Sequence, residues 1–191
     1  MKLFEKKIEF ELSKVFKNQN LKQSKILLMV SGGLDSMSML HLFYRKSSFF
    51  NSIAAVHINY QSHSESDNME SLINQICKKY QIRLFKKKIK IAKINYEHNA
   101  RLIRYDYAYK ILHQYQFNYI ITAHHIEDQV ETIYQNLSGN SNSFSLIGIR
   151  CKYNKILRPM ISVNKHEIQN YAFLNRLDYI NDPTNNSNIF F

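Results

Sequence analysis

Short apolar runs alternate with longer stretches of mixed polarity along most of this chain. The apolar runs at 25–30, 52–58 and 118–123 have the length and flanking residues of buried strands, and 82–89 is predicted as a further strand. The longer stretches repeat apolar residues at helical spacing, and they cover 34–45, 67–80, 99–116 and 125–137. Strands that alternate with helices form βαβ units. The pattern therefore predicts an α/β fold, a Rossmann-like parallel sheet of about five strands with helices on both faces.

The two ends of the chain add elements to this pattern. Residues 4–17 carry apolar positions at helical spacing and predict an N-terminal helix. Residues 138–145 are polar and turn-rich, so they form either a lid over a site or an ordinary surface connection. Asn164 and Glu167 have the spacing of a capping box, which predicts a helix over 164–177.

Length and composition bound the organisation of the chain. With 191 residues, 45% hydrophobic and 21% charged, it predicts one globular domain over 1–191. We expect its core at about 24–160 and a C-terminal helical extension at about 161–191. The apolar ending Ile189-Phe190-Phe191 suggests a longer parent protein. The chain has no run of about 18 apolar residues and no signal peptide pattern. We therefore expect no membrane partner and a cytoplasmic location, or an organelle stroma.

Charge and cysteine content narrow the chemistry. Lys and Arg outnumber Asp and Glu by 26 to 15, and the net charge of +11 favours a polyanion such as nucleic acid or an acidic surface. Residues 78–93 hold eight basic side chains and no acidic one, so they either follow an RNA backbone or protect a solvated edge strand. Cys77 and Cys151 form no CxxC pair. A zinc ribbon, an iron–sulfur site and a disulfide framework are therefore not expected.

The clearest motif follows the first expected strand, as Ser31-Gly32-Gly33-Leu34-Asp35-Ser36. Adjacent glycines let the backbone approach a ligand closely, and the next helix directs its N–H groups and partial positive charge at that ligand. The motif is not a Walker A loop, because it has no lysine. Asp35 suits a Mg²⁺ ion that lies between its carboxylate and a phosphate. The alternative is a plain Gly-Gly turn in which Asp35 caps the helix.

Polar residues also follow the other expected strands, at the edge of the sheet where parallel sheets bind ligands. His57 and Asn59 end the second strand, where they either meet adenosine or, for His57, pack in the core. His124 and Asp128 lie four positions apart after the fourth strand. Asp128 either ligates Mg²⁺ together with Asp35, deprotonates an amine, or only favours the helix dipole.

Arg101 and Arg104 lie three positions apart in an expected helix and so share one helix face. Two guanidinium groups side by side repel each other unless they face an anion, and phosphate suits their planar geometry. This pair indicates either a phosphate-binding face or a solvated basic face.

The loop at 31–36 resembles the pyrophosphate-binding SGGxDS loop of the N-type ATP pyrophosphatases, the PP-loop family. Together with it, three further motifs occur in the order found in the tRNA(Ile)-lysidine synthetases: VHIN at 56–59, EHNARLIRY at 97–105 and TAHHIEDQVET at 122–132. Arg158-Pro159 and the segment 182–185 are similar to later motifs of that family. The resemblance extends over residues 25–191.

The resemblance implies an adenine nucleotide alpha hydrolase-like fold and an ATP-dependent carbon–nitrogen ligase. In that family ATP adenylates the C2 oxygen of the wobble cytidine of tRNA(Ile) with a CAU anticodon, and diphosphate leaves. The amine of lysine then attacks C2, AMP leaves, and lysidine is formed. The implied partners are ATP, L-lysine and this tRNA, with Mg²⁺ as cofactor, and a homodimer is left open.

The residues expected at the site fall into four groups. ATP binding is expected of Ser31, Gly32, Gly33, Leu34, Asp35, Ser36, His57 and Asn59. Catalysis is expected of Asp128, Arg104, Arg101 and His124. A metal ion is expected on Asp35 and Asp128. Contact with tRNA is expected of Lys86, Lys87, Lys88 and Arg158.

Two departures from the family leave alternatives open. Ser138 stands where the family often has arginine, and the family's C-terminal tRNA-binding domains have no counterpart in this chain. One alternative is 2-thiolation of tRNA by another PP-loop enzyme, which the lack of a cysteine pair disfavours. The other is a non-catalytic remnant that binds ATP or tRNA.

Overall fold

The computed structural model describes residues 2–15, 23–91, 94–138 and 148–181. Its helices are α1 (Lys2–Val15), α2 (Leu34–Arg45), the 3₁₀ turn η2 (Ser47–Phe49), α3 (Ser66–Lys79), α4 (Tyr96–Gln114), α5 (Ile126–Ser138) and α6 (Lys165–Leu174). Its strands are β1 (Lys25–Met29), β2 (Ser52–Asn59), β3 (Arg83–Lys88), β4 (Tyr119–Ile121), β5 (Lys152–Tyr153) and β6 (Ile156–Leu157). The expected alternation of strands and helices is confirmed.

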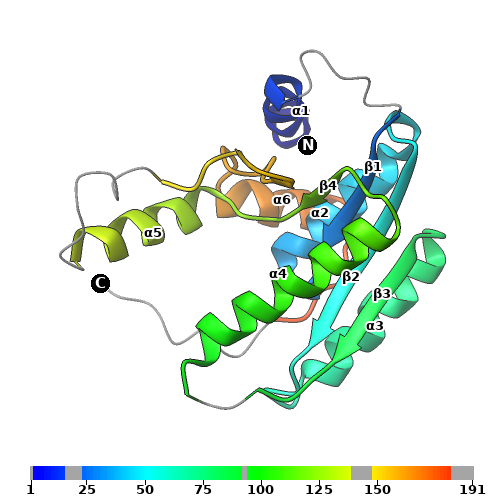
Figure 1. The fold of residues 1–191 in the computed structure, drawn as a ribbon. Helices are drawn as coiled ribbons and strands as arrows, with labels where there is room; N and C mark the ends of the chain where they lie inside the picture. Colours follow the sequence, from blue (N-terminus) through cyan, green and yellow to red (C-terminus); the bar gives the residue numbers. More distant parts are fainter. Residues whose placement is uncertain (1, 16–22, 92–93, 139–147, 182–191) are drawn as a thin grey trace.

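The strands form one sheet in the order β3-β2-β1-β4-β6-β5 (Figure 1). All neighbouring pairs are parallel except β5 and β6, which form an antiparallel hairpin at the edge. The sequence pattern does not predict this hairpin, because two residues per strand show no periodicity. The chain moves from β1 outward to β3 and then returns to place β4 on the other side of β1. Ligands of open α/β sheets bind at such a reversal, beyond the carboxyl ends of the strands.

Successive residues of the central strands pack on opposite faces of the sheet, as the period of two requires. Ile26 and Leu28 lie in the larger apolar cluster, with side chains of α1, α2, α3 and α6. Leu27 lies in the smaller cluster, which α4 covers with Ala108 and Ile111. Figure 1 shows α4 crossing one face of the sheet, with α2 and α3 behind it.

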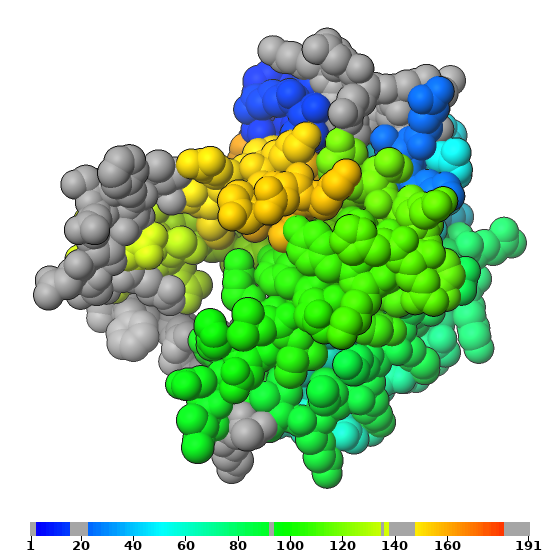
Figure 2. All heavy atoms as spheres, viewed as in Figure 1, coloured from blue at the N-terminus to red at the C-terminus, as the bar shows by residue number. Residues whose placement is uncertain are grey.

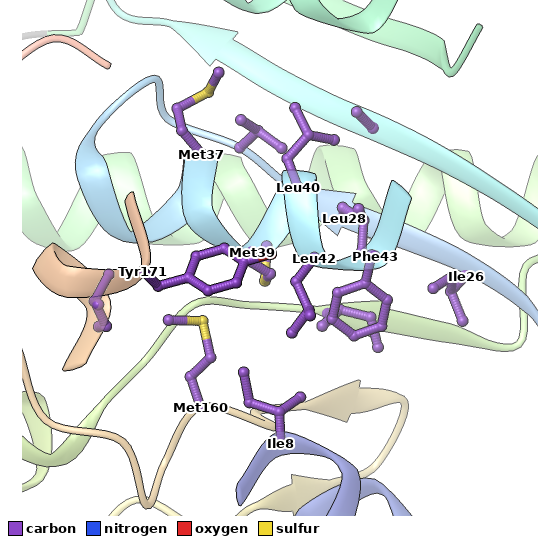
Figure 3. Close-up of a cluster of buried hydrophobic side chains, with 14 of the residues drawn as sticks. Ile8, Ile26, Leu28, Met37, Met39, Leu40, Leu42, Phe43, Met160 and Tyr171 are labelled. Atoms are coloured by element: carbon purple, nitrogen blue, oxygen red, sulfur yellow. The ribbon is translucent and has the colours of Figure 1, made fainter. Parts of the chain in front are cut away.

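The N-terminal helix α1 belongs to the same core as the sheet. Its Ile8 is fully buried, and Phe4 stacks on Tyr171 of α6 at 4.3 Å between ring centroids. Figure 3 shows Ile8, Met160 and Tyr171 gathered on the side of α2 that carries Met39 and Leu42. Core packing therefore extends beyond the expected range of 24–160 at both ends. It also supports α6, whose first turn reaches the candidate site.

Some expected boundaries shift. Helix α4 begins at Tyr96 instead of 99, and the third strand covers Arg83–Lys88 instead of 82–89. Residues 139–147, which make up most of the expected polar loop, and the motif at 182–185 lie outside the described residues. Within the part of the chain that the structure describes, no helix is both long and apolar enough to cross a membrane.

Candidate functional site

The loop at 31–36 joins β1 to α2 at the carboxyl edge of the sheet. Gly32 has a φ of +97°, and a β-carbon there would lie 2.9 Å from the β-carbon of Met69, so the position requires glycine. The hydroxyl of Ser36 accepts hydrogen bonds from the N–H groups of Ser31 (3.1 Å) and Gly32 (3.2 Å) and donates one to the carbonyl of Gly33 (3.0 Å). Ser36 therefore holds the loop in shape from within.

Helix α2 starts directly after this loop without a side-chain cap. Its N-cap residue is Gly33, so no side chain accepts from the first N–H groups of the helix. The N–H groups of Leu34 and Asp35 also have no acceptor within the helix, and the helix dipole adds partial positive charge there. The loop and helix together form an anion-binding geometry. The N–H of Ile180 donates to the carbonyl of Gly32 at 3.0 Å and packs the segment after α6 against the loop.

A lysine from the far end of the sequence meets the carboxylate of Asp35. The Lys165 ammonium lies 2.7 and 2.8 Å from the two oxygens of Asp35. Burial by itself would raise the pKa of Asp35, but hydrogen bonds and positive charge from His125 and Lys165 outweigh it, so the pKa lies below its usual value. A cation thus already stands beside the phosphate-loop geometry.

The first turn of α6 fixes the place of Lys165. Asn164 accepts from the N–H of Glu167 (2.8 Å), and Glu167 accepts from the N–H of Asn164 (3.0 Å), so the expected capping box is confirmed. Lys7 of α1 donates to the same Glu167 carboxylate at 2.8 Å. The backbone N–H of Lys165 donates to Glu127 of α5 at 2.9 Å. Three elements therefore hold this helix end in register with the loop.

The imidazole of His125 lies between carboxylates from two elements. Its Nε2 is 3.7 Å from Asp35, and its Nδ1 is 3.0 Å from Glu127 and 3.5 Å from Asp128. Burial would lower the pKa of His125, but the hydrogen bond with Asp35 and the nearby negative charges outweigh it and raise that pKa. Asp128 also accepts from the backbone N–H of His125 at 2.6 Å, so it caps the start of α5 as well as facing the ring.

His124 points to a different group of residues, the arginines. Its Nδ1 shares a hydrogen bond with the Thr122 hydroxyl at 2.7 Å. Burial, together with the charges of Arg158, Arg101 and Arg104, lowers the pKa of His124 to about 3. His124 is therefore neutral at physiological pH, and the arginines around it create a second region of positive charge beside the site. The structure thus brings together the expected residues Arg101, Arg104 and His124.

His57 and Asn59 lie inside the protein at the end of β2. Asn59 is 2% exposed and uses its amide on Asp67 (2.7 Å) and Glu70 (2.9 Å). His57 is 5% exposed, its Nδ1 bonds the carbonyl of Val30 at 2.8 Å, and its Nε2 is buried without a partner. These contacts give both residues a packing role, while their contact with ATP stays a prediction.

The residues expected to touch tRNA have different surroundings. Lys86 pairs with Glu70 at 2.8 Å and Lys88 with Asp67 at 2.7 Å, so two of the three lysines are neutralised. The ammonium of Lys87 lies over the ring of Tyr107 instead. Arg158 is 6% exposed and donates to the carbonyl of Arg150 at 2.9 Å. The charge of Arg158 acts on His124, and its contact with tRNA stays a prediction.

Asp35 and Asp128, the two residues expected to hold a metal ion, lie near one imidazole, that of His125. No group of three or more His, Cys, Asp or Glu side chains in the described ranges is arranged to hold a metal ion. Asp35 and Asp128 face the same imidazole from its two nitrogens, and both oxygens of Asp35 contact Lys165. Mg²⁺ in nucleotide enzymes commonly takes one or two carboxylates and completes its shell with phosphate and water. The donor set therefore fits a Mg²⁺ ion that arrives with a polyphosphate, and not a metal held by the protein alone.

Sequence reasoning missed Lys165, Glu127 and His125 as members of the site. One signal for Lys165 was present in the sequence: it follows the N-cap residue Asn164, and a cation in the first turn of a helix opposes the helix dipole. A residue that opposes a local rule often has a function elsewhere. For the pair His124-His125, nothing in the sequence tells which ring faces the carboxylates.

The comparisons with known proteins identify the family of this chain. A family model described as a PP-loop domain matches residues 4–191. The chain is 36% identical over 191 residues to a tRNA(Ile)-lysidine synthase of Petrotoga mobilis, covering 96% of this chain and 61% of that protein. It is 33% identical to a tRNA(Ile)-lysidine synthase of Clostridium tetani, covering 96% of this chain and 41% of that protein. The chain thus spans between two-fifths and about three-fifths of the length of these relatives.

Solved structures show the same fold at lower identity. The U34-tRNA thiolase NcsA of Methanococcus maripaludis superposes with a TM-score of 0.75 at 16% identity, covering 94% of this chain and 66% of that one. The NH3-dependent NAD synthetase of Campylobacter jejuni gives a TM-score of 0.60 at 18% identity, with 92% and 73% covered. The expected adenine nucleotide alpha hydrolase-like fold is confirmed.

Proposed function

The chain belongs to the PP-loop family, and we propose that it is the ATP-binding part of a ligase that joins lysine to the wobble cytidine of tRNA(Ile) with a CAU anticodon. The observation that carries this proposal is the meeting of three segments at one place. The uncapped start of α2, Lys165 of α6, and the His125 group of α5 face one another at the reversal of strand order. The relatives named tRNA(Ile)-lysidine synthase support the choice of substrate.

ATP would bind with its phosphates against the loop at 31–36. In this proposal the free N–H groups of α2 donate hydrogen bonds to the phosphate oxygens, and Lys165 turns from Asp35 to the phosphates. Asp35 and Asp128 would be the carboxylates that hold Mg²⁺. A bound Mg²⁺ ion neutralises charge that develops on the phosphates when diphosphate leaves.

The arginines would act at the reacting phosphate. Arg101 and Arg104 stand on the α4 side of the site, and their charges reach His124. In the first step the cytidine O2 attacks the α-phosphate and diphosphate leaves, so preorganised positive charge lowers the barrier. In the second step the amine of lysine attacks C2 and AMP leaves. In this proposal the carboxylate of Asp128, which lies beside the imidazole of His125, orients this amine and takes up its proton.

The cysteines disfavour the alternative of tRNA thiolation. Sulfur transfer often uses a catalytic cysteine pair or an iron–sulfur cluster, and burial raises the pKa of Cys77 to about 12. Burial, with the charge of Glu11 beside it, raises the pKa of Cys151 to about 11. Cys77 lies in the apolar core of the sheet and Cys151 is half-buried. Both positions are those of inert structural thiols.

The experiment that tests this proposal supplies the chain with ATP, Mg²⁺, labelled lysine and an unmodified tRNA(Ile) transcript with a CAU anticodon. We expect label in the tRNA and one equivalent of diphosphate for each lysine incorporated. The matched control is the same transcript with uridine in place of the wobble cytidine, which should receive no label. Diphosphate release without label would refute lysine ligation, and label in both transcripts would refute the cytidine as the target.

A further inference from the structure

The basic side chains of the edge strand β3 divide between its two faces. Lys86 and Lys88 point toward α3 and form ion pairs with Glu70 and Asp67. Arg83 and Lys87 alternate with them and point toward α4, because successive strand residues face opposite sides. One sequence run of positive charge thus becomes two surfaces with different properties.

The cations on the α4 side lie over aromatic rings instead of carboxylates. The guanidinium of Arg83 is 4.6 Å from the ring centroid of Phe85 and 4.4 Å from that of Tyr115. The ammonium of Lys87 lies 5.6 Å from the centroid of Tyr107.

Arg101 of α4 shows the same arrangement, 5.0 Å from the centroid of Tyr105. None of Arg83, Lys87 and Arg101 has a carboxylate within ion-pair distance among the residues that the structure describes. Lys152 and Lys155 also lie over a ring, that of Tyr119, but this tyrosine packs in the cluster on the other side of the sheet.

An aromatic ring positions a cation without cancelling its charge. A carboxylate at 2.8 Å leaves a neutral pair, whereas the quadrupole of a ring adds no net charge. The positive potential of Arg83, Lys87 and Arg101 therefore remains directed at the solvent. Helix α4 carries two acidic residues: Glu97 lies in its first turn, and Asp106 is paired with Lys110 at 2.8 Å. Part of the chain's surplus of positive charge therefore lies on this surface, without a compensating carboxylate within ion-pair distance in the described ranges.

We propose that this surface, made of Arg83, Lys87 and Arg101 with the rings of Tyr105, Tyr107 and Tyr115, binds the RNA substrate. The inference rests on the proposed function and names where its RNA lies. Figure 2 shows that α4, in green, spreads over the middle of one face, which is hollowed between α4 and α5. Arg101 belongs both to this surface and to the positive region around His124. RNA along α4 therefore leads directly to the candidate site.

Two features favour RNA over an acidic protein as the partner. The three tyrosines of this surface are half-buried, and each lies beside a cation. Unpaired bases of an RNA loop stack on such rings, and the phosphates between them pair with the cations. Carboxylates of an acidic protein use the charges but gain nothing from ring faces. Charge interleaved with aromatic rings is thus matched to a single-stranded anticodon loop.

The test compares two double variants of β3 that remove the same charge from opposite faces. In Arg83→Gln/Lys87→Gln the proposed surface loses two cations, and in Lys86→Gln/Lys88→Gln the carboxylate-paired face loses two. Binding of a fluorescent CAU anticodon stem-loop RNA is measured by anisotropy over a range of salt concentrations, without ATP or lysine. Arg101 is left unchanged because it belongs to the candidate site.

We expect the Arg83/Lys87 variant to bind RNA about tenfold more weakly near physiological salt, with a salt slope smaller by roughly 1.4 to 1.8. The Lys86/Lys88 variant should stay within about threefold of the parent chain, because paired lysines release few counterions. Equal weakening of both variants, no weakening of the first, or no RNA binding by the parent chain would each overturn the proposal. So would polyglutamate that competes as well as RNA at equal charge concentration.

This assay separates the surface from the reaction. If the Arg83/Lys87 variant binds RNA like the parent chain while the parent still transfers lysine, the surface is wrong and the proposed function stands. If the surface binds RNA as expected but no lysine enters the tRNA, the proposed function fails and the surface stands. A urea titration of each variant checks that both remain folded.

Discussion

Replacing Lys165 with methionine separates ligand binding from stability. In the protein without ATP, Lys165 makes two short contacts with Asp35, and the two side chains are 38% and 27% exposed. A partly exposed ion pair of this kind contributes at most about 1 kcal/mol to folding. Against this, a cation in the first turn of α6 opposes the helix dipole by about 0.3 to 1 kcal/mol. The two effects offset each other, so Lys165→Met should change the free energy of unfolding by less than about 1 kcal/mol.

The same substitution should weaken ATP binding strongly. A hydrogen bond between an ammonium group and phosphate contributes about 1.5 to 3 kcal/mol, because one partner is charged and the site is partly buried. At about 1.4 kcal/mol for each factor of ten, the Kd for ATP should rise roughly 10- to 150-fold. Isothermal titration with ATP and Mg²⁺ measures the Kd, and thermal melting measures the stability in parallel.

Two controls make this result specific. Lys165→Arg keeps the charge and should retain most of the ATP affinity, while Lys6→Met removes an exposed lysine of α1 and should leave the Kd unchanged. If the Kd of Lys165→Met for ATP stays within about twofold of the parent chain, the proposed contact is refuted, because losing a charged hydrogen bond to phosphate would raise the Kd much more. A large drop in melting temperature would show instead that the ion pair with Asp35 is mainly structural.

Three further predictions concern the same architecture. The pKa of His124 falls from 6.5 to about 3 on folding, so the folded protein loses stability as pH drops below 6.5, by up to about 1.4 kcal/mol per pH unit. His124→Asn should flatten this dependence of the unfolding free energy on pH, measured by urea titrations between pH 6.5 and 4. An unchanged pH dependence would contradict the burial of a neutral His124 ring. Gly32→Ala should destabilise the chain by about 1 to 3 kcal/mol and abolish ATP binding, because of the φ of +97° and the close approach of α3. Gly33→Ala should cost less than about 1 kcal/mol in the same denaturation assay, because the backbone is extended and a β-carbon would make only ordinary contacts, 3.7 Å from the Ser31 hydroxyl. Ile8→Ala should cost about 2 to 5 kcal/mol in urea unfolding, because Ile8 is fully buried, and a value below about 1 kcal/mol would show that α1 is not part of the core.

Local patterns in the sequence were sufficient for the elements and for part of the site. The apolar runs predicted the central strands β1, β2 and β4, because a strand buried on both faces must be largely apolar. The Gly-Gly loop predicted the anion-binding turn, because Gly32 needs a backbone conformation that other residues rarely adopt. The capping box at Asn164 and Glu167 predicted the start of α6, since its bonds span only three residues. Each of these features depends on neighbours close in the chain.

Only the tertiary structure decided which side chains meet. Lys165 reaches Asp35 across 130 positions because α6 packs on α2 and α1, and no local pattern encodes that contact. The choice between His124 and His125 follows from the direction in which the chain leaves β4. The run of lysines on β3 reads as one basic patch, yet the pleat of the strand and the carboxylates of α3 neutralise one of its faces. Contacts between particular side chains depend on how distant segments pack, whereas helices and strands depend on local spacing. For this reason the sequence predicted the helices and strands more fully than the side-chain contacts of the site.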